Sequence, residues 1–258
     1  MTFYFFKLLL FFYIYCFLGW CIESTIVSIS SRKFVNRGFL RGPVLPIYGS
    51  GAMLILLITY PVKVNWILVY FVGMIGTTLL EYVTGWGMEK ILKMRYWDYS
   101  NNRCNLDGYI CLKSSLFWGL LSLFLVYVIH PPLERILTHF SQTTLIILDI
   151  IITIAFVMDL IYAIRTALDV NKLLAALTTV KNDFEKTKAE LALKLSENDT
   201  AVRLNQKLDK LKADHQKLTQ KLDYFKRDFI LAHPTARSNR FNDALDEIRK
   251  EIANRRKK

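Results

Sequence analysis

The sequence predicts an all-α protein: a polytopic membrane domain of about five transmembrane helices, followed by a cytosolic antiparallel helical hairpin or coiled coil. Charge is uneven along the chain, because residues 1–165 hold only 13 of its 34 Lys and Arg and 8 of its 22 Asp and Glu. The same residues contain apolar runs of about 20 residues, which match the hydrocarbon thickness of a bilayer. Further along, apolar residues alternate at steps of three and four among charged ones, which is a heptad pattern. The expected domains are therefore a membrane domain (1–165), a helical hairpin or coiled coil (166–231) and a basic amphipathic tail (232–258).

Five membrane helices are expected in the first domain, consisting of a duplicated two-helix hairpin plus one further span. They cover residues 3–29, 44–60, 65–89, 112–130 and 144–165. The breaks between them carry Gly42-Pro43, Pro61 and Pro131-Pro132, residues that end or bend helices. The first span has no basic stretch before it and no small-residue cleavage site after it. We therefore expect a retained membrane helix there and not a signal peptide.

The loops alternate in positive charge, which predicts the orientation. Loops 30–43 and 90–113 hold four and five Lys or Arg, whereas loops 61–64 and 131–143 hold one each, and the residues after Arg165 are rich in both. Cytosolic loops carry the excess of Lys and Arg. We expect a multi-pass protein of the plasma membrane, with its N-terminus outside and its C-terminus in the cytosol. Lys7, near the outer end, is expected to reach the lipid headgroups.

The four cysteines predict no metal site and no cofactor. Cys16 and Cys21 lie in the first span, and Cys104 and Cys111 lie in a loop expected to be cytosolic, where thiols stay reduced. The spacing of the second pair is not a usual zinc spacing, and no His is near it in sequence. We expect four free thiols.

Three matches in the same order indicate an internal repeat of residues 17–60 and 83–130. The motif G-W-x-x-E ends both the first and the third span, at Glu23 and at Glu89. A basic loop follows each motif, and then a Gly-aromatic-aliphatic step and an aromatic-Gly pair. These are Gly38-Phe39-Leu40 with Tyr48-Gly49, and Gly108-Tyr109-Ile110 with Trp118-Gly119. Two hairpins of the same orientation predict a pseudo-two-fold axis along the membrane normal.

Five acidic residues form a candidate intramembrane or interface polar site: Glu23, Glu81, Glu89, Asp149 and Asp159. A charge inside a span costs a few kcal/mol and so needs a reason. One interpretation is a relay for ions or protons, or a site for a cationic substrate. The other is structural, with Glu23 and Glu89 paired to loop arginines and the remaining acids hydrogen-bonded across helices. We favour the structural interpretation for Glu23 and Glu89, and both stay open for Glu81 and Asp159.

The third span also places small and acidic residues at every fourth position, which forms a slanted stripe along the helix. The stripe consists of Gly73, Thr77, Glu81, Gly85 and Glu89. Such a stripe lets a neighbouring backbone approach closely and shields the carboxylates from lipid.

The two basic loops form a second candidate site, on the cytosolic side. Its residues are Arg37, Arg41, Arg95, Trp97, Asp98 and Arg103. Arginines beside glycines and aromatic residues are typical of an aromatic belt with headgroup contacts. They also fit a docking surface or an anion-binding pocket where the loops meet, and the presence of arginine and glycine in both loops slightly favours such a site.

Several of these motifs together resemble a bacterial membrane family, that of the type IV ABC-transporter proteins (CmpB-like). The resemblance rests on Gly19-Trp20-x-x-Glu23, on Phe34 to Pro43 with Pro46-Ile47-Tyr48-Gly49, on Glu81-Tyr82 with Gly85-Trp86, and on Trp97-Asp98-Tyr99-Ser100. It covers roughly residues 17–132, and the long charged C-terminal segment is similar to that of many members. It implies an ABC-transporter permease, and it supplies no catalytic residues.

The cytosolic segment contains two heptad seams. One begins at Val170 and the other ends at Phe229, and the phase slips between them at residues 196–200, which are typical of a turn. We favour two helices folded back as a hairpin over one helix paired with a second subunit. His215 lies at a seam position and is expected to set the register. Pro234 is expected to end the second helix, and a last amphipathic helix from Asn239 to Asn254 precedes a basic end that suits anionic lipid.

No enzyme motif is present: the sequence has no Gly-x-x-x-x-Gly-Lys-Ser/Thr run, no His-Glu-x-x-His and no Gly-x-Ser-x-Gly. The sequence favours a permease-like transport component of unknown substrate. The alternative is a membrane scaffold or regulator that recruits cytosolic proteins through its helical hairpin. The expected partners are the lipid bilayer, a separate ATP-binding subunit or another cytosolic protein, and a second copy of the chain. Nucleic acid is not expected, because no stacking aromatics accompany the basic residues.

Overall fold

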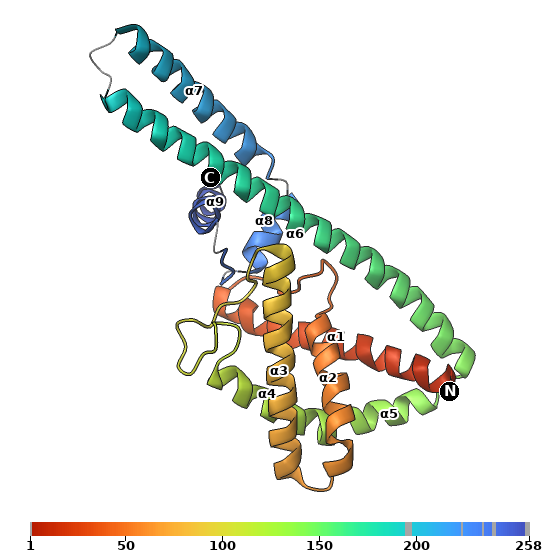
Figure 1. Cartoon of the computed structure of the whole chain (residues 1–258). Helices are drawn as coiled ribbons and strands as arrows, with labels where there is room; N and C mark the ends of the chain where they lie inside the picture. The colour runs from red at the N-terminus through yellow and green to blue at the C-terminus, as the bar shows by residue number, and fades with distance from the viewer. Residues whose placement is uncertain (1, 194–197, 223, 234, 239–240, 256–258) are drawn as a thin grey trace. The chain divides into compact units, whose positions relative to one another are not determined.

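The structure is a computed structural model that describes residues 2–193, 198–222, 224–233, 235–238 and 241–255. These residues form helices joined by loops (Figure 1), and an isolated antiparallel bridge pairs Leu106 with Ile110. The elements in order are α1 (Thr2–Ser31), α2 (Pro46–Thr59), η1 (Tyr60–Val62), α3 (Trp66–Leu92), α4 (Leu112–Phe124), η2 (Leu125–Ile129), α5 (His130–Thr138), α6 (Gln142–Leu193), α7 (Asn198–Gln220), α8 (Tyr224–Ala232) and α9 (Asn242–Arg255). The predicted all-α class is confirmed.

Among the described residues, four helical segments are long and apolar enough to cross a bilayer. They are Phe5–Ser31, Trp66–Leu92, Leu112–Thr138 and the apolar part of Gln142–Leu193. The second expected span is shorter, because α2 and the 3-10 turn η1 together cover only Pro46–Val62. At 1.5 Å per residue, 17 helical residues extend about 26 Å, slightly less than the hydrocarbon core. The count of about five therefore comprises four long helices and one short one.

The expected end of the fourth span at Pro131-Pro132 is wrong. The helix continues from α4 through η2, a π-helical turn, into α5, and it ends at Thr138. The two prolines follow the π-helical turn closely, and they cannot donate the backbone hydrogen bonds that a regular helix interior uses. A π-helical turn takes up the extra residue that this arrangement requires. The prolines therefore mark a change of helix type and not a loop.

The helix of the fifth expected span does not end at Arg165, because α6 runs without a break for 52 residues. Two compact units nevertheless divide the chain near this point. The first comprises Met1–Ile91 and Arg95–Ile164, and the second comprises Leu92–Met94 and Arg165–Lys258. The helix α6 begins in the first unit and ends in the second.

In the first unit, the two glycines of the repeated aromatic-Gly pair have the same packing role. A Cβ on Gly49 of α2 would lie 2.7 Å from the carbonyl oxygen of Phe12 in α1. A Cβ on Gly119 of α4 would lie 2.6 Å from the ring of Tyr70 in α3. Both glycines thus allow the second helix of a pair to approach the first closely. A core of apolar side chains supports the unit, and it includes Leu10, Phe11, Tyr15, Ile55 and Leu145.

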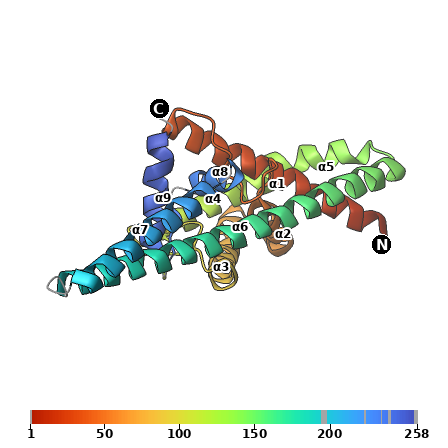
Figure 2. The same ribbon diagram turned by 90° about the horizontal axis from the view of Figure 1, so that it is seen from above.

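The second unit is built on the C-terminal part of α6. Figures 1 and 2 both show α7 running back alongside this part of α6, as the hairpin alternative requires. Leucines of both helices are buried, among them Leu174, Leu177, Leu204 and Leu208. The second arm is shorter than expected, because α7 ends at Gln220 and a separate helix, α8, begins at Tyr224.

The last helix, α9, begins at Asn242 and not at Asn239, and it is bound to the hairpin. Its Leu245, Ile248 and Ile252 are buried, as expected for the apolar face of an amphipathic helix. Glu247 forms ion pairs with His215 of α7 at 3.1 Å and with Lys181 of α6 at 3.8 Å. The predicted turn at 196–200 lies only partly within the described residues, since α7 begins at Asn198. Pro234 and the basic residues 256–258 lie outside them.

Candidate functional site

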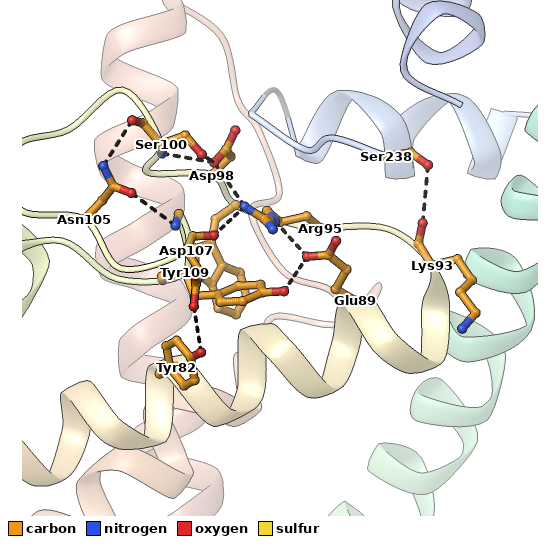
Figure 3. Close-up of polar contacts among 12 residues, drawn as sticks. Tyr82, Glu89, Lys93, Arg95, Asp98, Ser100, Asn105, Asp107, Tyr109 and Ser238 are labelled. Carbon is orange, nitrogen blue, oxygen red and sulfur yellow. Dashed lines mark hydrogen bonds and ion pairs between the residues drawn. The ribbon is translucent and has the colours of Figure 1, made fainter. Parts of the chain in front are cut away.

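Arg95 organises the second loop (residues 93–111), as Figure 3 shows. Its Nε donates a hydrogen bond to Glu89 Oε2 at 2.8 Å, and its Nη1 donates one to the carbonyl oxygen of Asp107 at 2.7 Å. The guanidinium also lies 3.5 Å from Asp98 Oδ1 and 4.4 Å from the centre of the Tyr109 ring. Burial opposes the charged guanidinium, but the hydrogen bond and charge of Glu89 raise the pKa of Arg95 above its usual value. Arg95 is therefore a cation whose charge is balanced by the nearby carboxylates of Glu89 and Asp98.

The second loop turns back at Gly108, which has a φ of +73°. A Cβ there would lie 2.5 Å from Ser100 Oγ and 2.6 Å from Arg95 Nη1, so only glycine fits. The nearby side chains hold the loop through its own backbone. Asp98 Oδ1 accepts hydrogen bonds from the backbone N–H and the hydroxyl of Ser100, and the Asn105 amide donates to two backbone carbonyls. The result is a compact loop fixed to the cytosolic end predicted for α3.

The repeated motif glutamates each accept a hydrogen bond from a tyrosine. Tyr48 OH donates to Glu23 Oε1 at 2.8 Å, and Tyr109 OH donates to Glu89 Oε2 at 2.7 Å. Burial and the hydrogen bond to Glu89 raise the pKa of the Tyr109 phenol above its usual value. Glu89 thus pairs with a loop arginine as the structural interpretation requires, whereas the partner that the structure gives Glu23 is Tyr48.

Glu81 lies on the buried face of α3, with a side chain that is 6% exposed. Trp118 Nε1 of α4 donates to its Oε2 at 3.1 Å, and Tyr99 OH of the second loop donates to its Oε1 at 3.3 Å. Burial, followed by the negative charge of Glu81, raises the pKa of the Tyr99 phenol. Both donors are neutral groups, so neither of them supplies a positive charge to the Glu81 carboxyl group.

The two glutamates are joined through aromatic side chains. The rings of Tyr48 and Trp118 lie 5.1 Å apart, so ring packing connects the Tyr48–Glu23 hydrogen bond to the two that Trp118 and Tyr99 donate to Glu81. We call these five residues the glutamate chain. Glu23 and Tyr48 come from the first expected repeat and Tyr99 and Trp118 from the second, while Glu81 lies just before the second. Tyr48 and Trp118 are the aromatic residues of the repeated aromatic-Gly pair, which is the signal in the sequence that could have identified them.

The other two acids of the candidate site do not join this chain through any of their recorded contacts. Asp159 of α6 accepts hydrogen bonds from the backbone N–H groups of Arg41 at 3.1 Å and Gly42 at 2.8 Å. Asp149 of α6 is 1% exposed, and in the described structure neither of its carboxylate oxygens has a hydrogen-bond partner. Asp159 thus has a structural role, although its hydrogen bonds go to the backbone of a loop and not to another helix. The structural interpretation does not account for Asp149, which has no such partner.

The loop arginines bind separate partners and do not converge on one pocket through the contacts that the structure records. The guanidinium of Arg41 lies 4.3 Å from the centre of the Tyr162 ring in α6, whereas Arg95 binds Glu89. The side chain of Arg37 is half-buried, and that of Arg103 is exposed. The expected anion pocket of four arginines is thus not supported, because Arg41 and Arg95 each have a nearer partner of their own.

The two basic loops do meet, through aromatic rings. The Phe39 and Tyr96 rings lie 5.2 Å apart at 89°. Trp97, the other expected loop aromatic, donates its indole N–H to the carbonyl oxygen of Tyr109 at 2.9 Å. The aromatic residues therefore make one contact between the two loops and one within the second loop.

A third polar group, which the sequence did not reveal, links α1 to α5. Lys7, expected to reach the headgroups, lies 3.7 Å from Glu134, and Tyr15 OH lies 2.7 Å from His130 Nδ1. Within the described part of the chain, no three His, Cys, Asp or Glu residues lie close enough to hold a metal ion. All four cysteines are free thiols in the structure.

Comparison with known proteins identifies the membrane part of the chain. The model of the family described as "Putative ABC-transporter type IV" matches residues 10–164. The match includes every residue of both candidate sites and the whole glutamate chain. No curated protein and no solved structure matches the chain. Because the match covers more than half of its residues, the chain belongs to this family of type IV ABC-transporter membrane proteins.

Proposed function

We propose that this chain is the permease-like component of a transporter whose ATP-binding subunit is a separate protein. Membership of an ABC-transporter family supports a transport role. The 258 residues contain no phosphate-binding Gly-x-x-x-x-Gly-Lys-Ser/Thr run, so ATP binding falls to a partner. We propose no catalytic role for the chain itself.

The observation that carries this proposal is the glutamate chain. Ionisable residues inside a membrane domain are costly and mark pathways for ions, protons or substrates. Glu81 is buried, is bound by neutral donors and is linked through Trp118 and Tyr48 to Glu23. This arrangement places two hydrogen-bonded glutamates on either side of a packed pair of aromatic rings, where the first and second helix pairs meet. A proton or a small cation is the cargo that it suits.

The two basic loops supply the proposed contact with the ATP-binding subunit. Each is anchored to a helix through a carboxylate, the first by Asp159 and the second by Glu89. If a partner displaces a loop that is anchored in this way, the helix that carries the anchoring carboxylate is displaced with it. The proposal places both loops in the cytosol of a bacterial cell, in a multi-pass protein of the plasma membrane, as the positive-inside rule requires.

Affinity purification of the tagged full chain from native membranes tests this proposal. We expect an ATP-binding protein to co-purify, and ATP hydrolysis by the complex to require the chain. Glu81→Gln should leave the complex intact but lower coupled hydrolysis about tenfold or more, because an amide cannot take up and release a proton as a carboxyl group can. Glu134→Gln is the matched control, since that side chain is 55% exposed. Absence of an ATP-binding partner, or full hydrolysis by Glu81→Gln, contradicts the proposal.

The second candidate function is a membrane scaffold that recruits cytosolic proteins. The observation in its favour is the second unit, which has a buried core of its own and a last helix bound across the hairpin by Glu247. In this case, co-purified proteins would bind no ATP. Their recovery would also survive the combined neutralisation of Glu81, Asp149 and Asp159.

A further inference from the structure

Asp149 differs from the other acids of the candidate site because it is buried without a partner. It is 1% exposed, and among the described residues neither of its carboxylate oxygens accepts a hydrogen bond. Asp159, further along the same helix α6, instead accepts two backbone N–H groups, at 3.1 and 2.8 Å. An isolated carboxylate charge is very costly in an apolar interior, and a group placed there becomes neutral instead. The surroundings of Asp149 therefore favour a carboxyl group that carries a proton.

The position of Asp149 in α6 places it inside the membrane domain. It follows Gln142, the first residue of α6, by seven positions, which is about 10 Å along a helix. The nearby side chains of Ile147, Ile150 and Ile151 are exposed, so they form the face toward lipid, and Asp149 lies on the opposite, buried face. In lipid no water replaces a missing partner. A metal ion needs several oxygen ligands, whereas a proton is a ligand that this carboxyl group can hold alone.

The buried face of α6 packs on the apolar core of the first unit. Leu145, one turn before Asp149, is fully buried in the core that also contains Tyr15 of α1. Thr153, one turn after Asp149, accepts a hydrogen bond from Tyr13 OH of α1 at 2.9 Å. Residues four positions apart share a face of a helix. Asp149 therefore lies between these two contacts and borders the core to which Tyr15 belongs.

Tyr15 links this core to a group that water can reach. Tyr15 is 3% exposed, and its hydroxyl lies 2.7 Å from Nδ1 of His130. The side chain of His130 is 23% exposed, and its Nε2 lies 3.9 Å from the exposed carboxylate of Glu134. Glu134 also lies 3.7 Å from Lys7. These two charges lie at the end of the domain predicted to be outside, and they keep water close to the His130 ring.

An imidazole between water and a phenol can pass a proton from one to the other, because each of its nitrogens can hold a hydrogen. When the hydrogen is on Nδ1, the bare Nε2 takes up a proton from water. Nδ1 then gives its hydrogen to the Tyr15 oxygen, and Tyr15 releases its own hydroxyl proton toward the core. One proton enters and one leaves, and the His130 ring is neutral again. The same steps in reverse carry a proton outward.

We propose that Asp149 is a proton-binding site of the membrane domain, and that His130 and Tyr15 carry protons between it and the outer side. Rotation of the Asp149 side chain, which no recorded hydrogen bond fixes, completes the transfer from Tyr15. The site shares no residue with the glutamate chain. The proton site itself does not depend on the transport role, whereas its use to drive transport rests on the proposed function.

Infrared spectroscopy of the full chain in lipid nanodiscs tests the proton site, because a protonated carboxyl group has a carbonyl stretching band that a carboxylate lacks. At neutral pH we expect Asp149→Asn to remove one such band, and Asp149→Glu to keep a band at a shifted frequency. Asp159→Asn is the matched control and should leave all these bands, since two N–H donors suit a charged carboxylate. Unchanged bands in Asp149→Asn, or loss of the same band in Asp159→Asn, contradict the proposal.

The rate at which the Asp149 band shifts after transfer into heavy water tests the route, because the shift requires exchange of the bound proton. Tyr15→Phe and His130→Gln should each slow the shift about a hundredfold, the lower end of what a positioned proton-transfer group contributes. Tyr13→Phe is the matched control, since it removes the hydroxyl of another buried tyrosine of α1, which bonds Thr153 instead. An unchanged rate in Tyr15→Phe, or equal slowing by Tyr13→Phe, contradicts the route. No partner is present in these samples, so failure of the affinity purification leaves both results untouched.

Discussion

Trp118 illustrates how a single neutral donor can determine the state of an intramembrane acid. Its indole N–H donates a hydrogen bond to Glu81, as the Tyr99 hydroxyl does, and its ring packs on Tyr48. Inside a membrane domain no water replaces a missing donor, so the carboxyl group would be left partly unsatisfied. The residue therefore serves both the polar contact and the packing between helix pairs.

Trp118→Phe should lower the free energy of unfolding by about 1–3 kcal/mol, the cost of leaving a buried polar group without its partner. Trp86→Phe is the matched control, because the Trp86 side chain in α3 is 46% exposed. Denaturant unfolding of both variants in the same detergent measures the difference. Equal stability of the two variants would show that the indole hydrogen bond does not hold Glu81.

The sequence identified the acidic residues of the candidate site but not the side chains that donate hydrogen bonds to them. The acids were visible, because any carboxylate in an apolar run is conspicuous, and Glu81, Glu89 and Asp159 all proved to have specific partners. Their partners were not visible. Tyrosine and tryptophan donors are ordinary residues of a membrane helix, and only the tertiary structure brings Tyr99 to Glu81.

At the scale of the helix pair, the repeated glycines decide how closely the helices pack. Gly119 of α4 lies against the Tyr70 ring of α3, and Gly49 of α2 lies against the backbone of α1. Small residues permit such approach in membranes, where packing rather than hydrophobic burial drives helix association. The glutamate chain depends on this approach, because Trp118 directly precedes Gly119.

Gly119→Ala should therefore destabilise the protein, by about 1–3 kcal/mol as for other overpacked cores. Gly87→Ala should stabilise it slightly, by about 0.5–1 kcal/mol, because nothing lies within 4 Å of a Cβ at that helical position. The two variants carry the same chemical change, so thermal unfolding compares them directly. Two equal shifts of the same sign would contradict the packing role of Gly119.

The positions of the helices could be predicted from apolar runs, but two of their ends could not. Pro131-Pro132 is typical of a break, yet the helix passes through it from α4 to α5, with the π-helical turn η2 just before the prolines. The change from lipid to water near Arg165 changes the composition but leaves the backbone helical in α6. Amino-acid composition therefore predicts whether a helix lies in lipid or in water better than it predicts where the helix ends.

At the scale of the whole molecule, the account depends on the membrane orientation of the two basic loops. The family membership and the four long apolar helices make this a membrane protein, and the proposed function needs both loops on the cytosolic side. If they lay outside, neither the Glu89–Arg95 pair nor the Asp159 anchor could meet an ATP-binding subunit. Each native or introduced cysteine in these loops therefore reports on the proposal.

Labelling of Cys104 with a membrane-impermeant thiol reagent is the most direct test of this orientation. Cys104 is a free, exposed thiol of the second loop, and the other three cysteines can be replaced by serine. Val64→Cys is the control for the opposite side, since Val64, in the short turn before α3, is 95% exposed. The account predicts that intact cells protect Cys104 and label Val64→Cys, and that Cys104 reacts once the membrane is opened. Labelling of Cys104 in intact cells, with Val64→Cys protected, would contradict it.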